Sequence, residues 1–380
     1  MLFRSYVVVV VLPAVQAEFG VARADASLPY TLTMIGFGVG GMLMGRLADR
    51  FGVAVPILLG SIGLGTGFVV AGMAQNIWVF AIAHGVLCGL LGSSATFAPL
   101  IADTSMWFAK RRGIAVAVCA SGNYVAGAVW PPIAQHFIET VGWRSTYIGI
   151  GIFCAITMFA LGLLLKRRPP TGASVAAAQS SLASDKPFGL TPGQAQFWLC
   201  VAGIACCVAM SMPQVHIVAY CGDLGYGAAR GAQMLSLMLG FGVLSRLISG
   251  VICDKIGGIR TLLLGSGLQC LALLLFLPFD GMWSLYLVSA LFGLFQGGIV
   301  PAYAIIVREY FSPKEAGARV GTVLMFTMLG MALGGWMSGK IFDWTGSYNA
   351  AFLNGIAWNA LNLVIAITLM RRAAKSLRTT

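Results

Sequence analysis

The sequence predicts an all-α membrane protein with twelve transmembrane helices in two pseudo-symmetric six-helix halves. Composition, a series of long apolar runs and an internal repeat lead to this prediction. Of the 380 residues, 58% are hydrophobic and only 9% are charged, and the mean hydropathy is +0.87. Soluble domains carry about 25% charged residues, so lipid has to be the solvent for most of this surface.

The apolar runs define the helices. A spanning helix needs about 20 apolar residues, and eleven runs of that kind follow one another along the chain. They lie at 28–48, 55–74, 78–103, 113–137, 145–165, 196–220, 232–252, 260–279, 283–307, 316–340 and 348–370. A twelfth, shorter candidate extends from Tyr6 to Ala17. Residues 166–195 are rich in Pro, Ser, Ala and Gly, which is typical of a flexible connector.

Short motifs recur in the same order on both sides of this connector. The segment Gly45–Gly52 (GRLADRFG) returns as Gly250–Gly257 (GVICDKIG). The other matches are Trp107–Gly113 with Tyr310–Gly317, Gly142–Tyr147 with Gly346–Ala351, and Gly20 with Gly225. Such a repeat indicates two similar halves. We expect a first half at 1–165, a cytoplasmic linker at 166–195, a second half at 196–372 and a cytoplasmic tail at 373–380.

The repeat also bears on the N-terminus. The second half begins its first run near Gln194, so the matching run would begin before Met1. The first helix is therefore expected to be truncated, with Arg4 near mid-membrane as a candidate substrate contact; the alternative for Arg4 is a terminal charge at the interface. A rival interpretation is a signal peptide in which Tyr6–Leu12 is the apolar region and cleavage follows Val15–Ala17.

The positive charges predict the orientation. Most lie in loops on the side of the linker, where Lys and Arg favour the cytoplasm. These residues are Arg46, Arg50, Lys110–Arg112, Lys166–Arg168, Lys255, Arg260, Arg308, Lys314, Arg319, Arg371, Arg372, Lys375 and Arg378. The opposite side holds little more than Arg23, Arg144, Arg230 and Lys340. We therefore expect a multi-pass protein of the cell inner membrane with both termini cytoplasmic.

Several function classes are disfavoured. The net charge of +12 is spread over short loops, so lipid and topology explain it better than nucleic acid. The nine cysteines lie mostly within apolar runs and form no paired C-x-x-C pattern, so no metal site or disulfide framework is expected. No nucleotide-binding G-x-x-x-x-G-K-[ST] loop occurs, and no nucleophile, base and acid set stands out. We expect no cofactor and no enzyme activity.

The motif Gly45–Gly52 and its copy resemble the signature of the major facilitator superfamily, G-x-L-a-D-r-x-G between helices 2 and 3. Leu12–Gly20, Arg111–Ala117, Pro131-Pro132 and Phe342–Tyr348 resemble the branch of bacterial monocarboxylate transporters and oxalate/formate antiporters. This resemblance implies the major facilitator fold and transport by alternating access. It also implies a gating role for the signature segments, through Gly45, Arg46, Asp49, Arg50, Gly250 and Asp254; the alternative is a plain loop with charges that set the topology.

Arg246 is the leading candidate for the substrate site. It lies near the middle of an apolar run, and the positions one turn away are Gly242 and Gly250. Charged groups at membrane depth usually face a cavity, and a guanidinium can bind a carboxylate in bidentate fashion. In the branch that the sequence resembles, an arginine at this place on helix 8 binds the substrate carboxylate. A structural pair with an unidentified acid is the alternative.

Two departures from that branch matter. Proton-coupled animal members carry an aspartate where this chain has Gly242, so coupling through that position is not available. Oxalate carriers have a lysine on helix 11, whereas Leu324–Gly330 contains no cation. This favours a monocarboxylate over a dicarboxylate. Further candidates to line the cavity are polar or aromatic residues, for each of which packing is the competing role: Tyr30, His84, Asn123, Tyr124, His216 and Tyr303.

The sequence therefore predicts a monomeric secondary transporter for a small organic anion. It leaves open whether a proton or a counter-anion is the coupling partner, and hence symport or antiport. An efflux carrier for an apolar, drug-like compound is the alternative, and a lone arginine argues against it because efflux carriers usually place acids in the cavity.

Overall fold

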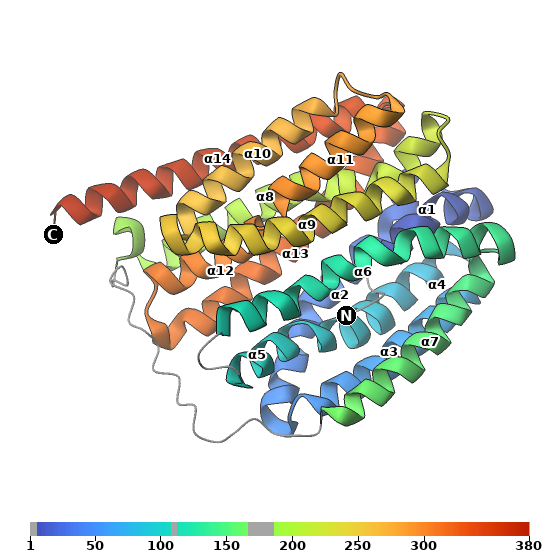
Figure 1. Ribbon diagram of the computed structural model, residues 1–380, viewed down its shortest axis with the longest axis horizontal. Coiled ribbons are helices and arrows are strands. Elements are labelled where there is room, and N and C mark those ends of the chain that lie inside the picture. The colour runs from blue at the N-terminus through green and yellow to red at the C-terminus, as the bar shows by residue number, and fades with distance from the viewer. Residues whose placement is uncertain (1–5, 108–111, 166–185, 380) are drawn as a thin grey trace.

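A computed structural model describes residues 6–107, 112–165 and 186–379, and this part of the chain is a bundle of helices without a strand (Figure 1). The elements are α1 (Tyr6–Phe19), α2 (Arg23–Phe51), α3 (Ala54–Gly72), α4 (Ile77–Ile82), η1 (Ala83–Ser93), η2 (Ser94–Thr96), α5 (Ala98–Trp107), α6 (Arg112–Val141), α7 (Trp143–Leu164), η3 (Pro187–Gly189), α8 (Pro192–Asp223), α9 (Ala228–Ile256), α10 (Gly258–Leu275), α11 (Met282–Gln296), α12 (Ile299–Tyr310), α13 (Pro313–Thr345) and α14 (Tyr348–Thr379).

These elements make up the twelve predicted helices. Ten helical stretches of the described residues are long and apolar enough to cross a membrane. In the order of the twelve helices, the fourth is made of α4, η1, η2 and α5, and the tenth of α11 and α12. α6, with 30 residues, takes the fifth place, and α1 is a shorter apolar helix. Arg4 lies outside the described residues.

The repeat seen in the sequence has a counterpart in the backbone. In each half, a glycine with positive φ ends a helix or links two helices at the matching place. A positive φ is strained for other residues, which explains why glycine recurs there. The pairs are Gly20 (61°) with Gly225 (80°), Gly52 (86°) with Gly257 (82°), and Gly142 (82°) with Gly346 (66°).

The signature segments, which the resemblance places between two helices, are themselves mostly helical. α2 continues to Phe51 and α9 to Ile256, so in each copy only the final glycine leaves the helix. The amide of Gly52 donates to the carbonyl oxygen of Ala48 at 2.8 Å, and that of Gly257 to Cys253 at 2.9 Å. These bonds close the last helical turn before the positive-φ glycine redirects the chain.

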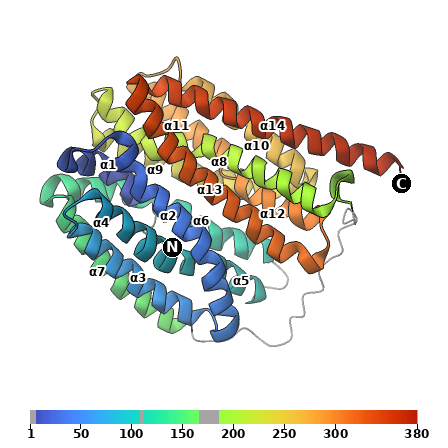
Figure 2. The same cartoon turned by 180° about the vertical axis from the view of Figure 1, so that it is seen from behind.

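The two halves lie side by side and meet mainly through two helix pairs (Figures 1 and 2). α2 of the first half packs on α13 of the second, and α6 packs on α9. Near the start of α2 these helices nearly touch, since a Cβ atom added at Gly339 would lie 3.0 Å from the Cα of Ala24. Near the end of α2 they diverge: a Cβ atom at Gly45 or Gly317 would meet no atom of the described residues within 4 Å. The halves are closed together at one end and separated at the other.

Candidate functional site

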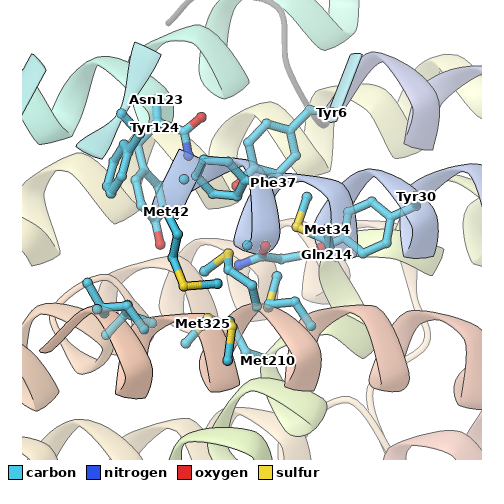
Figure 3. A pocket seen from close by; sticks show the side chains of 18 of the residues that line it. Tyr6, Tyr30, Met34, Phe37, Met42, Asn123, Tyr124, Met210, Gln214 and Met325 are labelled. Carbon is cyan, nitrogen blue, oxygen red and sulfur yellow. The ribbon is translucent and has the colours of Figure 1, made fainter. Parts of the chain in front are cut away.

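A cavity of about 270 Å³ lies between the halves, beside the places where α2 crosses α13 and α6 crosses α9 (Figure 3). Side chains from both halves line it, so any molecule bound there contacts both. The lining residues are Tyr6, Tyr30, Met34, Phe37, Gly38, Gly41, Met42, Phe97, Asn123, Tyr124, Met210, Gln214, Arg246, Val300, Gly321, Leu324, Met325, Met328 and Met331.

Arg246, on α9, brings the charge to this cavity and is only half-buried. Its Nη1 donates to the carbonyl oxygen of Ala120 on α6 at 3.0 Å, and its Nε lies 3.4 Å from the carbonyl oxygen of Gly297. The guanidinium carbon lies 4.3 Å from the centre of the Tyr124 ring, within the range of a cation–π contact. Among the described residues, no carboxylate is within ion-pairing distance of Arg246. The cavity therefore contains an uncompensated positive charge held by neutral groups.

Gly242 determines how Arg246 is held. A Cβ atom at position 242 would lie 2.5 Å from both Cδ1 and Cε1 of Tyr124, closer than atoms can approach. The ring of Tyr124 thus occupies the space that a side chain at 242 would need. A carboxylate at this position, one turn before the arginine, is incompatible with the stacking of Tyr124 on Arg246.

The remaining polar groups around the cavity are few and neutral. Asn123 precedes Tyr124 on α6, and Tyr6 and Tyr30 approach from α1 and α2 (Figure 3). The Nε2 of Gln214 on α8 donates to the Oε1 of the buried Gln296 at 2.6 Å. These groups can orient a bound molecule through hydrogen bonds, but none of them adds a charge.

Four of the predicted site residues line the cavity together: Arg246, Tyr30, Asn123 and Tyr124. His84 does not, because it is buried in the first half among the rings of Phe68, Phe80 and Tyr147. Tyr303 does not either, because its hydroxyl donates to Asn362 at 2.7 Å inside the second half.

His216 also lies away from the cavity, in a network that joins the halves at the closed end. Its Nε2 donates to the carbonyl oxygen of Gly335 at 2.8 Å, and its Nδ1 is 3.4 Å from the hydroxyl of Tyr348. Arg23, at the start of α2, donates to that hydroxyl at 2.8 Å and forms an ion pair with Asp223 at 3.1 Å. Arg23 thus connects the first half to α8 and α14 of the second.

Asp343 strengthens this closed end by capping α2 from the other half. The residue before the helix, Ala22, offers no side-chain cap. Instead, the carboxylate of Asp343 on α13 accepts from the backbone amides of Arg23 at 2.8 Å and Ala24 at 2.9 Å. A carboxylate at a helix N-terminus satisfies orphan amides and complements the helix dipole. We call Arg23, Asp223, Asp343 and Tyr348 the latch.

The residues predicted to gate lie at the separated end. Arg46 and Arg50 are exposed on the last turns of α2, where the guanidinium of Arg50 lies 5.2 Å from the centre of the Phe51 ring. Asp254 is exposed at the matching place on α9. Gly45 and Gly250 lie in the helices. The side chain of Asp49 is outside the described part of the structure.

Sequence reasoning missed most of the cavity wall. Tyr6, Gln214, Phe37, Phe97 and six methionines line it but were not predicted. Met325, Met328 and Met331 recur every three residues, a spacing that places them on one face of α13. That signal was available in the sequence, although it cannot be told apart from ordinary packing without the opposite wall.

Relatives with curated descriptions match this chain at low identity. The "MFS-type transporter opdF" of Penicillium oxalicum is 28% identical over 293 residues, covering 75% of this chain and 66% of that protein. "Monocarboxylate transporter 13" of Rattus norvegicus is 26% identical over 355 residues, covering 90% and 78%. The "Uncharacterized MFS-type transporter YcxA" of Bacillus subtilis is 25% identical over 374 residues, covering 96% and 90%. The chain thus spans just under two thirds of the length of the first of these.

Solved structures share the fold. A crystal structure of the nucleoside transporter NupG superimposes with a TM-score of 0.73 at 13% identity, covering 97% of this chain and 96% of that one. The sequence model of the "Major Facilitator Superfamily" matches residues 1–281 and 242–380. The two halves, the cavity between them and this match agree: the chain belongs to the Major Facilitator Superfamily and is a multi-pass membrane protein.

Proposed function

We propose that this protein is a secondary active transporter that moves a small organic anion, a monocarboxylate, across the inner membrane by alternating access. The proposal depends on Arg246, a cation without an acidic partner among the described residues, at a cavity between the halves. A planar guanidinium suits a carboxylate. One such cation accommodates one carboxylate.

The opposite wall supports a single anionic group. α13 faces the cavity with Gly321, Leu324, Met325, Met328 and Met331, and none of these can hold a second carboxylate. The name of the rat relative, a monocarboxylate transporter, points in the same direction. Gly242 has no titratable side chain, so the proposal does not couple a proton through that position.

The contact of Arg246 with α6 suggests how binding is coupled to movement. Nη1 of Arg246 donates to the carbonyl oxygen of Ala120 across the interface between the halves. A carboxylate that binds the guanidinium in bidentate fashion takes over this donor and replaces a direct contact by one made through the substrate. Substrate binding would then change a contact at the interface between α6 and α9, which has to rearrange during transport.

The two ends of the bundle correspond to the two sides of the membrane in this proposal. Positive charges at the end of α2 favour the cytoplasm there, which makes the described state open to the cytoplasm and closed at the latch. The signature segments, with Arg46 and Arg50, would approach the second half only when the cytoplasmic end closes. This assigns them the gating role implied by their resemblance.

A second candidate is efflux of an apolar, drug-like compound, favoured by the methionine and aromatic residues of the cavity. Such a substrate would not need Arg246. The two candidates therefore differ in what a change at this residue does.

The deciding experiment is uptake of a panel of labelled carboxylates into proteoliposomes. Loss of a charged hydrogen-bonded pair costs about 3 kcal/mol, so Arg246→Ala should lower apparent affinity about 100-fold, and Arg246→Lys should retain part of it. Arg230→Ala, an exposed arginine at the start of the same helix, is the matched control. Equal transport of carboxylates by wild type, Arg246→Ala and Arg246→Lys would refute the proposal, and retained uptake of a neutral compound would favour efflux.

A further inference from the structure

We infer that the transported acid carries a bulky apolar body, such as an aryl or long alkyl group, and is not a short acid of the acetate class. The inference rests on the monocarboxylate function proposed above and extends it to the other end of the substrate. Its basis is the uneven chemistry of the cavity. Among the described lining residues, Arg246 carries the only charge, and the neutral Asn123 also lines the cavity. Most of the other lining side chains are methionine or aromatic.

The volume of the cavity favours an acid with a bulky apolar body over a short acid. A volume of about 270 Å³ approaches the lower end of pockets for drug-sized ligands, which begin at about 300 Å³. The methionine wall is the set of six methionines that line the cavity: Met34, Met42, Met210, Met325, Met328 and Met331. An acetate-like anion at Arg246 would leave this wall facing water, which forms few hydrogen bonds there. An apolar body that displaces this water gains affinity.

The wall is made by both halves at their crossing. A Cβ atom at Gly38 on α2 would lie 3.6 Å from Cγ of Met325 and from Cβ of Met328 on α13. Met34 and Met42 flank Gly38 on α2 and also line the cavity (Figure 3). An apolar body seated here touches both halves, while the carboxylate is held at Arg246.

Methionine also determines the kind of selectivity. Its side chain is unbranched and adapts to irregular shapes, so a methionine wall selects for apolar area more than for one outline. We therefore expect affinity to increase steadily with the apolar size of the acid until the cavity is full. Straight-chain and aryl acids of similar area should bind comparably.

Calorimetric titration of the purified protein with unbranched acids from acetate to hexanoate tests this. Burial of one methylene should tighten binding about fourfold, so hexanoate should bind far more tightly than acetate. 3-Phenylpropionate should bind in the range of hexanoate. Its neutral amide should bind much more weakly, because it lacks the charge for Arg246.

Variants of the wall show where the apolar body lies. The double change Met325→Gln and Met328→Gln keeps side-chain length but adds polar groups, so it should weaken hexanoate binding about tenfold or more and weaken acetate binding far less. Met325→Leu with Met328→Leu should retain hexanoate binding, which separates polarity from misfolding. Met73→Gln, at an exposed position after α3, is the control.

The outcomes distinguish this inference from the function on which it rests. Equal affinity for acetate and hexanoate, with both lost in Arg246→Ala, would overturn the apolar body and leave the monocarboxylate function intact. Equal binding of 3-phenylpropionate and its amide would overturn the monocarboxylate function itself. A steep dependence on chain length that the glutamine variants do not reduce would place the apolar body elsewhere and overturn the inference.

Discussion

Tyr124 and Gly242 together hold the guanidinium of Arg246 at the cavity. The ring lies against the charged group on one side and fills the space above Gly242 on the other. Arg246 is thereby kept at the interface by a contact from the opposite half. A side chain at 242 would have to displace the ring before it could fit.

Gly242→Ala should therefore weaken substrate binding without removing any charged group. A cation–π contact contributes about 0.5–2 kcal/mol, so we expect affinity for a carboxylate to fall about 2- to 30-fold, as measured by calorimetric titration. Gly240→Ala on the same helix is the control, since its Cβ atom would make an ordinary contact of 3.7 Å with Ala128. Equal losses in the two variants would show that the ring of Tyr124 does not position Arg246.

The sequence singled out Arg246 because a charge within an apolar run is conspicuous, and the structure places this residue at the cavity. The sequence could not separate Tyr124, which lines the cavity, from Tyr303, which bonds Asn362 inside the second half. Both are aromatic residues near mid-helix, and only the rotation of each helix in the bundle decides which way they face. That rotation depends on contacts between distant parts of the chain, so the histidines were equally ambiguous.

Among the helices, α9 and α11 pack so closely that their backbones almost touch. A Cβ atom at Gly293 would lie 1.9 Å from the carbonyl oxygen of Met238. A similar approach occurs in the first half, where a Cβ atom at Gly36 would lie 2.1 Å from the carbonyl oxygen of Gly85. Small residues at such crossings allow close van der Waals packing in membrane helices.

Gly293→Ala should destabilise the second half, because the obstructing atom belongs to the backbone and cannot rotate away. Overpacking of this kind costs about 1–3 kcal/mol, which should lower the melting temperature of the detergent-purified protein by several degrees. Gly267→Ala on α10, where an added Cβ atom meets no described atom within 4 Å, should leave the melting temperature nearly unchanged. A Gly293→Ala protein as stable as wild type would contradict the close approach.

Apolar runs predicted the helices well because lipid imposes their length. They did not predict the π-helical stretch Ala83–Ser93 or the interruption after Gln296. Both irregularities occur where glycine brings two backbones together, as at Gly85 and Gly297. A hydropathy pattern shows which residues avoid water, but it contains no information about the contacts between helices that distort or interrupt them.

For the molecule as a whole, the latch is the contact between the halves that has to break in the proposed alternating-access cycle, when the closed end opens. It joins Arg23 and the first amides of α2 to Asp223, Asp343 and Tyr348 of the other half. Hydrogen bonds to charged groups each contribute about 1.5–3 kcal/mol. The latch therefore favours the described state over one open at this end.

Asp343→Ala should shift this balance. A loss of about 2 kcal/mol changes the ratio of the two states about 30-fold. Spin labels can be attached at Met73 and Trp283, which are exposed residues of opposite halves at this end. Pulsed electron paramagnetic resonance should then measure a longer distance between the two labels in the variant. Glu315→Ala, which removes an exposed ion pair with Arg319 within α13, is the control. An unchanged distance distribution in Asp343→Ala would exclude this role of the latch.

Because Asp343 caps α2 from the other half, hydrogen exchange in the first turn of α2 measures how often the halves separate at this end. The two capped amides are protected from solvent deuterium only while the halves are joined at this end, since the chain has no cap of its own at Ala22. The rate at which the amides of Arg23 and Ala24 take up deuterium should therefore follow the fraction of time spent open there. Hydrogen exchange at these residues would follow substrate-driven turnover in the unlabelled, unmodified protein.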